Sequence, residues 1–312
     1  MKNNNQTIDV LCIGEVLIDF IGHQHGVKIS NTRDYHRYLG GSPANVAMNV
    51  ARLGLKSEMV STVGNDGFGS YIFKRLTEAG VGINNMATVN NKTTSIIFIS
   101  RTDGTPDFMP FRDADYHITE QQLPTKLLLQ SKVYHTTCFA LSKSPARETI
   151  LAKAKEAQSM GCTLSIDVNY AQKLWESQEQ ALQAITAYCA LNPLVKISED
   201  DMLRLFERKL PHDEIFNFFH KCGVDTVCLT LGSKGVKLSQ KGKAVIERPA
   251  IKIERILDAT GAGDAFWSGF LFAYINNKPI SKCLDVALQL AALKLQNVGR
   301  LPDNINIISK LL

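Results

Sequence analysis

The strongest constraint on the fold is a repeated alternation of short apolar runs with longer helical segments. Four apolar runs are short enough to be buried strands, at 133–137, 163–168, 195–198 and 226–231. Helical segments are predicted near 146–159, 177–190, 199–206, 213–221 and 282–297. Alternating strands and helices form a parallel sheet with helices on both faces. The sequence therefore predicts a doubly wound, mostly parallel α/β fold.

The amino-terminal part begins in the same way, with a strand at 10–14, a helix within 40–54 and a strand at 58–63. Two regions then break the alternation. Residues 21–39 are polar and aromatic without helical periodicity, and residues 93–101 are rich in Ile, Thr and Phe, with a hairpin signal at Asp103-Gly104. We expect a small β-lid from 21–39 and 93–116, inserted into an α/β domain of residues 1–20, 40–92 and 117–312.

Composition narrows the possible functions. The 312 residues suit one large domain with an appendage, and the net charge of +5 comes from scattered Lys and Arg. No nucleic-acid surface is indicated, although anionic small ligands would fit. No apolar run reaches the ~18 residues of a membrane span, and residues 1–7 carry no apolar signal region. The seven dispersed cysteines favour reduced thiols in the cytoplasm, and the absence of CxxC or HExxH patterns argues against structural zinc.

The stretch 258–264, Asp-Ala-Thr-Gly-Ala-Gly-Asp, leads into an apolar run that is long enough for a buried helix. Gly261 and Gly263 allow successive N–H groups to point one way at the helix start, which makes an anion site. Asp264 beside such a site could accept a proton from a hydroxyl. The alternative is a turn with a carboxylate that only stabilises the helix. Phe266 excludes a GxGxxG fingerprint, and no Lys-Ser/Thr of a P-loop follows.

A second glycine-rich stretch, 40–54, predicts a helix that Ser42 is expected to cap. Asn45 and Asn49 lie one turn apart on one face of that helix and need polar partners, either a ligand or neighbouring backbone. Glu15 and Asp19 stand among apolar residues. Burying an unpaired carboxylate is costly, so Asp19 should face a ligand or partner, unless it lies at an edge in solvent.

Polar residues and glycines follow the later strands, where an α/β sheet binds its ligands. They are groups that nucleotide phosphates and magnesium prefer, although each alone also fits a cap or a turn. They are Asp167, Asn169, Ser198, Glu199, Thr230, Gly232 and Gly235.

Together, 40–54 and 258–270 resemble the two signatures of the ribokinase-like (PfkB) sugar kinases. The segments 64–69, 167–169, 230–235 and 291–299 are collinear with further motifs of that family. The resemblance covers nearly the whole chain. It implies a doubly wound α/β domain with a β-lid, and transfer of the γ-phosphoryl group of ATP to a sugar hydroxyl.

The resemblance also assigns roles. Asp264 would be the base, and the amides of Gly261, Ala262 and Gly263 the anion hole. The sugar would be held by Asp19, Gly40, Gly41, Asn45 and Arg112. ATP and Mg2+ would lie near Asn169, Lys196, Ser198, Glu199, Thr230, Gly232, Ser233 and Gly235. A loop that binds a monovalent cation such as K+ in many members would include Asp258, Thr260 and Gly299.

Three positions depart from the family. Val168 replaces a proline, and residues 198–201 replace an Asn-x-x-Glu motif, so the contact that orders magnesium differs. Leu288 stands where many members place an asparagine near the adenine. None of these changes removes the predicted catalytic residues.

The segments 103–115 and 141–147 resemble the fructokinase branch, which implies D-fructose as the acceptor, at C6 or C1. Arg112 could donate paired hydrogen bonds to sugar oxygens, or it could extend along a lid edge. A 2-keto-3-deoxygluconate kinase would use such an arginine for a carboxylate, but Asp113 and Asp115 would partly neutralise Arg112. A ribokinase, a nucleoside kinase and a non-catalytic sugar sensor are the further alternatives. A homodimer through the lid is expected by analogy.

Overall fold

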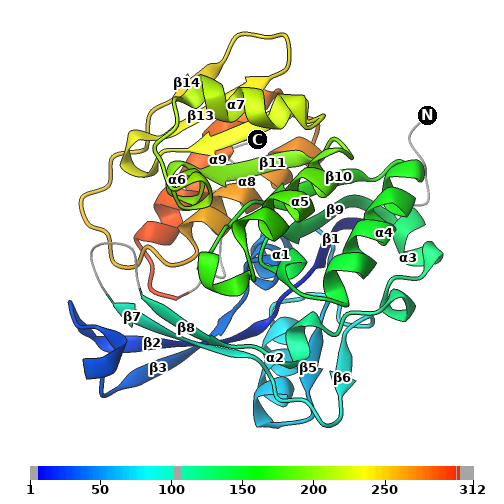
Figure 1. The fold of residues 1–312 in the computed structure, drawn as a ribbon, viewed down its shortest axis with the longest axis vertical. Helices are drawn as coiled ribbons and strands as arrows, with labels where there is room; N and C mark the ends of the chain where they lie inside the picture. Colours follow the sequence, from blue (N-terminus) through cyan, green and yellow to red (C-terminus); the bar gives the residue numbers. More distant parts are fainter. Residues whose placement is uncertain (1–5, 102–106, 300, 303–312) are drawn as a thin grey trace.

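The computed structural model describes residues 6–101, 107–299 and 301–302. Its main sheet has the strand order β14-β13-β12-β11-β10-β9-β1-β4, parallel except for β13 and β14 (Figure 1). The strands are β1 (Ile8–Ile13), β4 (Ser57–Val60), β9 (Ser131–Thr137), β10 (Thr163–Asp167), β11 (Leu194–Ser198), β12 (Thr226–Thr230), β13 (Val236–Gln240) and β14 (Ile246–Arg248). The predicted doubly wound α/β fold is confirmed.

Helices cover both faces of this sheet. Those packed on the first face are α1 (Ser42–Arg52), α2 (Gly67–Glu78), α8 (Ala262–Ile275) and α9 (Ile280–Leu295). Those packed on the second face are α3 (Thr125–Leu129), α4 (Ala146–Ser159), α5 (Gln178–Cys189), α6 (Glu199–Phe206) and α7 (His212–Lys221). Short 3-10 segments lie at Ile29–Asn31, Ala114–Tyr116, Glu120–Gln122, Ala140–Ser142, Gln172–Leu174 and Gly232–Lys234.

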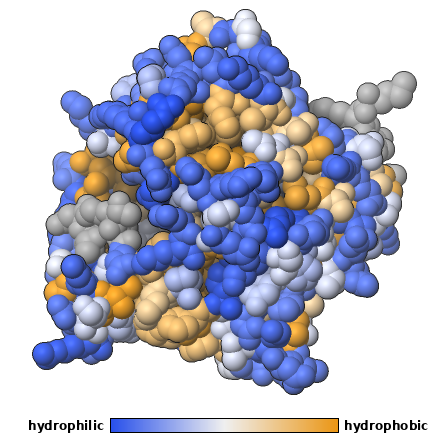
Figure 2. Space-filling view, in the orientation of Figure 1, coloured by the Kyte–Doolittle hydropathy of each residue, from blue (hydrophilic) through white to orange (hydrophobic). Residues whose placement is uncertain are grey.

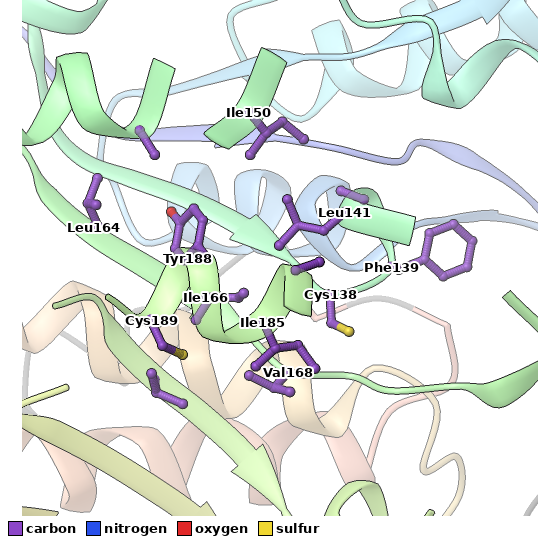
Figure 3. Packing of buried hydrophobic residues seen from close by; sticks show 14 of the residues in the cluster. Cys138, Phe139, Leu141, Ile150, Leu164, Ile166, Val168, Ile185, Tyr188 and Cys189 are labelled. Atoms are coloured by element: carbon purple, nitrogen blue, oxygen red, sulfur yellow. The ribbon is translucent and has the colours of Figure 1, made fainter. Parts of the chain in front are cut away.

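The strands are apolar because they are buried on both faces. Leu164 and Ile166 of β10 point to the second face, where they meet Ile150 of α4 and Tyr188 of α5 (Figure 3). On the first face, α8 packs against α1 and α9, and its apolar surface is almost wholly buried. Trp267 of α8 donates its indole N–H to Ser165 Oγ over 2.9 Å. This contact fixes α8, and therefore its amino terminus, against the sheet.

A second sheet with the order β3-β2-β7-β8 is formed by β2 (Leu17–His25), β3 (Tyr35–Gly40), β7 (Ile96–Arg101) and β8 (Phe108–Phe111). Phe98 packs against Phe20 with ring centroids 5.2 Å apart. Hydrophobic surface gathers over these strands in the lower left of Figure 2. The strands come largely from the two segments proposed as the lid, although β2 begins at Leu17 and β3 ends at Gly40, one to four residues outside those segments. We call the four strands the lid sheet. The hairpin signal Asp103-Gly104 lies outside the described residues.

Two local predictions need correction. The single strand expected at 58–63 is divided, because the chain leaves the main sheet after Val60 and β5 (Thr62–Gly64) pairs instead with β6 (Ala87–Val89). The cap expected at Ser42 is also wrong. Gly41 is the N-cap of α1, and the Ser42 hydroxyl is bound elsewhere.

The remaining fold-level expectations concern cysteines, metals and membranes. All seven cysteines are free thiols, and all but Cys222 are buried. Within the described ranges, no three His, Cys, Asp or Glu side chains gather as a metal cluster. Among the helices of these ranges, none has both the length and the apolar character to cross a bilayer.

Candidate active site

Asp264 lies in the first turn of α8, three residues after the Gly261 N-cap, whose φ of 74° is left-handed. Its Oδ1 accepts a hydrogen bond from Ser42 Oγ over 2.6 Å, and its Oδ2 accepts one from Asn45 Nδ2 over 2.8 Å. The two glycine-rich stretches of the sequence therefore meet at one carboxylate. Asp264 is thus the polar partner that Asn45 was expected to need on a helix of small, apolar residues. Hydrogen bonds from both sides fix the direction of the Asp264 carboxylate.

Ser42 is a site residue that the sequence interpretation missed. Its backbone N–H donates to Oε1 of the buried Glu15 over 3.1 Å, and Oε2 of Glu15 accepts from Thr137 Oγ1 over 2.7 Å. Burial raises the pKa of Glu15 to about 8, although the bond from Thr137 opposes this. Glu15 therefore joins β1, β9 and the start of α1. The serine gave no signal beyond its place before Pro43, which fits a helix cap equally well.

Asp19 extends from β2 toward the same region. A Cβ on Gly40, in the adjacent strand β3, would lie 2.3 Å from Asp19 Oδ2, so only glycine leaves room for this carboxylate. Burial, with a smaller contribution from the negative charge of Asp264, raises the pKa of Asp19 to about 7. A partly buried acid that carries a pKa near neutrality is typical of a functional site.

The predicted anion hole lies at the start of α8. Lys196 Nζ lies 3.0 Å from the place where a Cβ on Gly263 would stand, so a lysine ammonium is directly beneath the first turn. Asp167 accepts hydrogen bonds from Lys196 Nζ at 2.8 and 2.9 Å. Burial would lower the pKa of Lys196, but Asp167 and Asp201 raise it above its usual value. The ammonium of this buried ion pair therefore lies next to the amides of Gly261–Gly263.

The Ala262 amide is engaged within the loop itself, because its N–H donates to the Ala259 carbonyl over 3.2 Å. A phosphate would compete with this carbonyl for the amide. The position of the loop before α8 therefore controls how well the anion hole is formed.

The residues predicted to bind the nucleotide lie at the carboxyl ends of β10, β11 and β12, or in the loops that follow. Asn169 Oδ1 accepts from the Phe139 amide over 3.1 Å, and Thr230 Oγ1 donates to the Ile197 carbonyl over 3.3 Å. Ser198 caps α6 in a reciprocal capping box with Asp201. Glu199 lies 2.9 Å from His212 Nε2. Gly232 and Ser233 open the turn after β12, and Gly235 closes it with a φ of 103°.

Arg112 is not an extended surface arginine. Its guanidinium donates twice to Asp115 Oδ2, at 2.6 and 3.0 Å, and also to Ser142 Oγ over 2.5 Å. Both charged side chains of the pair are at most 3% exposed. The neutralisation expected from the neighbouring acids comes from Asp115, whereas Asp113 pairs with Lys92 over 3.0 Å.

A cavity of about 270 Å³ opens between the lid sheet, α1 and α2. Asp19 and Asn45 line one part of it, together with Asn49 of α1. Three arginines that the sequence interpretation did not single out also line it. They are Arg37, Arg52 and Arg75, and they come from β3, α1 and α2. Arg37 lies over the Tyr71 ring at 4.0 Å, and Arg75 pairs with Glu78 over 2.7 Å.

The predicted cation loop borders the same cavity. Asp258 Oδ1 accepts from the Thr260 amide and Oδ2 from the Gly299 amide, each over 2.9 Å. Oδ2 also accepts from Lys294 Nζ over 3.0 Å. The sequence interpretation includes Lys294 only within the segment 291–299. A charged residue in an apolar run is nevertheless the same kind of signal that identified Asp19.

Comparisons with known proteins identify the family of this chain. Residues 7–305 match the model of the pfkB family carbohydrate kinases. An ATP-dependent 6-phosphofructokinase of Thermoanaerobacterium thermosaccharolyticum is 34% identical over 300 residues, which cover 96% of this chain and 92% of that protein. A probable fructokinase, fructokinase-7 of Arabidopsis thaliana, is 34% identical over 281 residues, covering 86% and 81% of the two chains.

Two solved structures have the same fold. Fructokinase from Halothermothrix orenii superposes with a TM-score of 0.81 at 32% identity, covering 91% of this chain and 98% of its own. A sugar kinase from Pyrococcus horikoshii in complex with ATP superposes with a TM-score of 0.81 at 29% identity, covering 93% of each chain. The chain therefore belongs to the pfkB family of carbohydrate kinases and is an ATP-dependent sugar kinase.

Proposed function

We propose that the protein phosphorylates a ketose of the fructose type, with Asp264 as the base for the attacking hydroxyl. The observation that carries this proposal is the carboxylate of Asp264, held by Ser42 and Asn45 next to an amide-rich helix start. The hydroxyl oxygen forms its bond to the γ-phosphorus while its proton passes to Asp264. The bond to the bridging oxygen breaks, and ADP leaves.

The amides of Gly261, Ala262 and Gly263, with the ammonium of Lys196 beneath them, would stabilise the charge on the transferred group. Asp19 and Asn45 would hold sugar hydroxyls, beside Gly40 and Gly41. Most of the rate enhancement would then come from positioning and charge stabilisation.

ATP would lie along the carboxyl edge of the sheet, near Asn169, Ser198, Glu199, Thr230, Gly232, Ser233 and Gly235. The described residues form no cage of three acidic or His ligands, which suits Mg2+ held mainly by the nucleotide phosphates and one or two carboxylates. Glu199 is the acid that we propose for that contact. When bound, Mg2+ neutralises phosphate charge.

The state of Arg112 gives no support to an anionic sugar, because its side chain is only 3% exposed. Asp115 neutralises its charge within a buried pair, so a carboxylate there would meet a cancelled charge. This argues against 2-keto-3-deoxygluconate as the preferred acceptor. Ribose and nucleosides remain weaker alternatives, since the relatives described above are named for fructose or fructose 6-phosphate.

A second candidate acceptor is a phosphorylated ketose such as fructose 6-phosphate. The observation that favours it is the set of Arg37, Arg52 and Arg75 around the cavity that also contains Asp19 and Asn45. Asn45 and Arg52 lie seven residues apart on α1, about 10 Å along the helix axis. This span is on the scale of a hexose phosphate. Arginine is also the side chain best suited to phosphate.

Comparing kcat/KM for fructose, fructose 6-phosphate, 2-keto-3-deoxygluconate and ribose tests both candidates. A tenfold preference for fructose supports the first candidate, and a tenfold preference for fructose 6-phosphate replaces it with the second. A preference for the sugar acid or for ribose contradicts both. If no sugar of the panel supports ATP turnover, the result would instead favour a non-catalytic sensor. The ordered Asp264 site argues against that alternative.

Arginine variants show whether the cavity binds a phosphate. If it does, Arg52→Gln should lower kcat/KM for fructose 6-phosphate about tenfold or more, the effect of one hydrogen bond to a charged group, and leave fructose unaffected. Arg208→Gln is the matched control, because this arginine lies between α6 and α7 and pairs with Glu214. Equal losses for both sugars would show that Arg52 is only structural.

We also propose that the subunits pair through the lid sheet. Its strand β8 carries Met109 and Phe111, which are 43% and 52% exposed. A cytoplasmic location is in keeping with the seven free thiols. The resemblance also implies a loop at Asp258, Thr260 and Gly299 where many members bind a monovalent cation such as K+, and the charge at Lys294 bears directly on whether this chain binds one.

A further inference from the structure

The ammonium of Lys294 is enclosed by oxygen atoms at the end of α9. Its side chain is only 4% exposed. Nζ lies 3.0 Å from Asp258 Oδ2, 3.1 Å from the Asn297 carbonyl oxygen and 3.5 Å from the Asp258 carbonyl oxygen. One ammonium with three protons thus faces one carboxylate and two carbonyls. Asp258, which supplies two of the three oxygens, is 36 residues from Lys294 in the chain, and Asn297, which supplies the third, is 3 residues from it.

These contacts hold the loop that leads into the anion hole. The Leu257 amide donates to the Leu295 carbonyl over 2.8 Å, which ties the start of the loop to the last residue of α9. Lys294 then binds Asp258, and the next residues lead to Gly261 at the start of α8. The Lys294 Cε lies 3.8 Å from the place where a Cβ on Gly261 would stand, so the lysine packs directly against this part of the loop.

The local charge requires a cation at this point. Asp258 is half-buried. Its carboxylate accepts hydrogen bonds from the amides of Thr260 and Gly299 and from Lys294 Nζ. A buried carboxylate beside inward-facing carbonyls is costly unless a positive charge balances it. Carboxylate and carbonyl oxygens are ligands for a free monovalent cation as well as for an ammonium. Here the covalently attached ammonium occupies that place.

We propose that Lys294 is a built-in monovalent cation that positions the anion-hole loop, so that phosphoryl transfer by this enzyme does not require potassium. The proposal rests on the proposed phosphoryl transfer at Asp264. Lys294 is a positioning residue, because it acts through Asp258 and the backbone of residues 257–261 and not on the substrate. It also gives a physical reason to expect no potassium requirement from a loop that otherwise resembles a cation site.

The test compares wild type with Lys294→Ala, which removes the ammonium and leaves space for an external ion. Turnover is measured in tetramethylammonium chloride, with K+, NH4+ or Na+ added. Wild type should be insensitive to these ions. Lys294→Ala should lose about tenfold to hundredfold in kcat, the cost of a misplaced catalytic element, with little change in sugar KM. Added K+ or NH4+ should restore much of that loss. Lys282→Ala, at the other end of α9, should behave as wild type.

Thermal unfolding gives a second readout that does not depend on finding the sugar. K+ should raise the Tm of Lys294→Ala by several degrees more than that of wild type. Lys294→Gln keeps the packing and serves the same comparison if the alanine variant does not fold. Potassium-dependent turnover by wild type, or variants that are no more sensitive to potassium than wild type in turnover and Tm, would overturn the proposal. A wild type without transfer to any sugar would instead contradict the proposed function, and the Tm comparison would still decide the role of Lys294.

Discussion

The hydroxyl of Ser42 lies 2.6 Å from Oδ1 of Asp264, although the two residues are 222 positions apart in the chain. This bond joins the first turn of α1 to the first turn of α8. Asn45 makes a second bond from α1 to the other oxygen of the same carboxylate. The base is therefore oriented by a helix that also lines the cavity where the sugar is proposed to bind.

Ser42→Ala tests that orientation. A hydrogen bond to a charged group contributes about 1.5–3 kcal/mol, so we expect kcat to fall by about tenfold while the Kd for ATP stays unchanged. Steady-state kinetics and a nucleotide titration provide the two values. Ser42→Thr keeps a hydroxyl and should recover part of the loss. Full activity in Ser42→Ala would mean that Asn45 alone orients Asp264.

Asp19→Asn tests the role of this partly buried acid through the pH dependence of the reaction. Asp19 ionises near pH 7 in the folded protein, and it must be ionised to accept hydrogen bonds from two sugar hydroxyls. In wild type, kcat/KM for the sugar should therefore decrease as the pH falls through about 7. The variant should have a higher sugar KM and should lose this acid limb. An acid limb that persists unchanged in the variant would assign the ionisation to another group.

The same substitution affects stability with a defined sign. The unfolded chain ionises Asp19 above about pH 4, whereas the folded protein keeps it protonated up to about 7. Stability from this group is therefore present below about pH 4, falls as the pH rises from about 4 to 7, and stays reduced above that. Asp19→Asn should raise Tm at pH 8 and have little effect at pH 4. An equal change in Tm at both values would contradict the raised pKa.

Gly235→Ala tests the predicted nucleotide loop. A Cβ at this position would lie 2.1 Å from the Arg248 carbonyl oxygen, at a φ of 103°. We expect destabilisation by about 1 kcal/mol or more and a higher KM for ATP, because the turn after β12 must move. Gly242→Ala is the control, since its φ of 77° is also positive but no atom lies within 4 Å of the added Cβ. Equal effects of the two variants on ATP KM would remove the loop from the nucleotide site.

Phe111→Ser tests the proposed dimer. If the subunits pair through the lid sheet, this change on β8 should shift the mass from dimer to monomer by light scattering. Leu203→Ser on α6, at a side chain that is 46% exposed, should leave the mass unchanged. A wild type that is already monomeric would contradict the proposal.

Most of the fold could be predicted because its signals are local. Buried parallel strands leave continuous apolar runs, and α4 and α6 have the predicted bounds. The antiparallel edge β13–β14 was not predicted, because β13 alternates apolar with polar residues and β14 has only three residues, so neither leaves a continuous apolar run. The break after Val60 was missed because both parts of the strand are buried and differ only in their pairing partners.

The site was predictable where a motif encodes it, as at Gly261–Asp264, and less so where long-range contacts define it. Asn45 was expected to need a partner, but only the fold could identify it as Asp264. Arg37, Arg52 and Arg75 are far apart in sequence and separately look like surface residues. They line one cavity because β3, α1 and α2 converge there. Sequence spacing carries no information about that convergence.

The most direct test of the central claim compares phosphoryl transfer by wild type and Asp264→Asn, with the best acceptor from the sugar panel. The account predicts steady ADP and sugar phosphate formation by wild type. It predicts a loss of about two to four orders of magnitude in the variant, as expected for a positioned base, with the Kd for ATP and the Tm unchanged within error. Turnover by Asp264→Asn at the wild-type rate would contradict the assignment of Asp264 as the base.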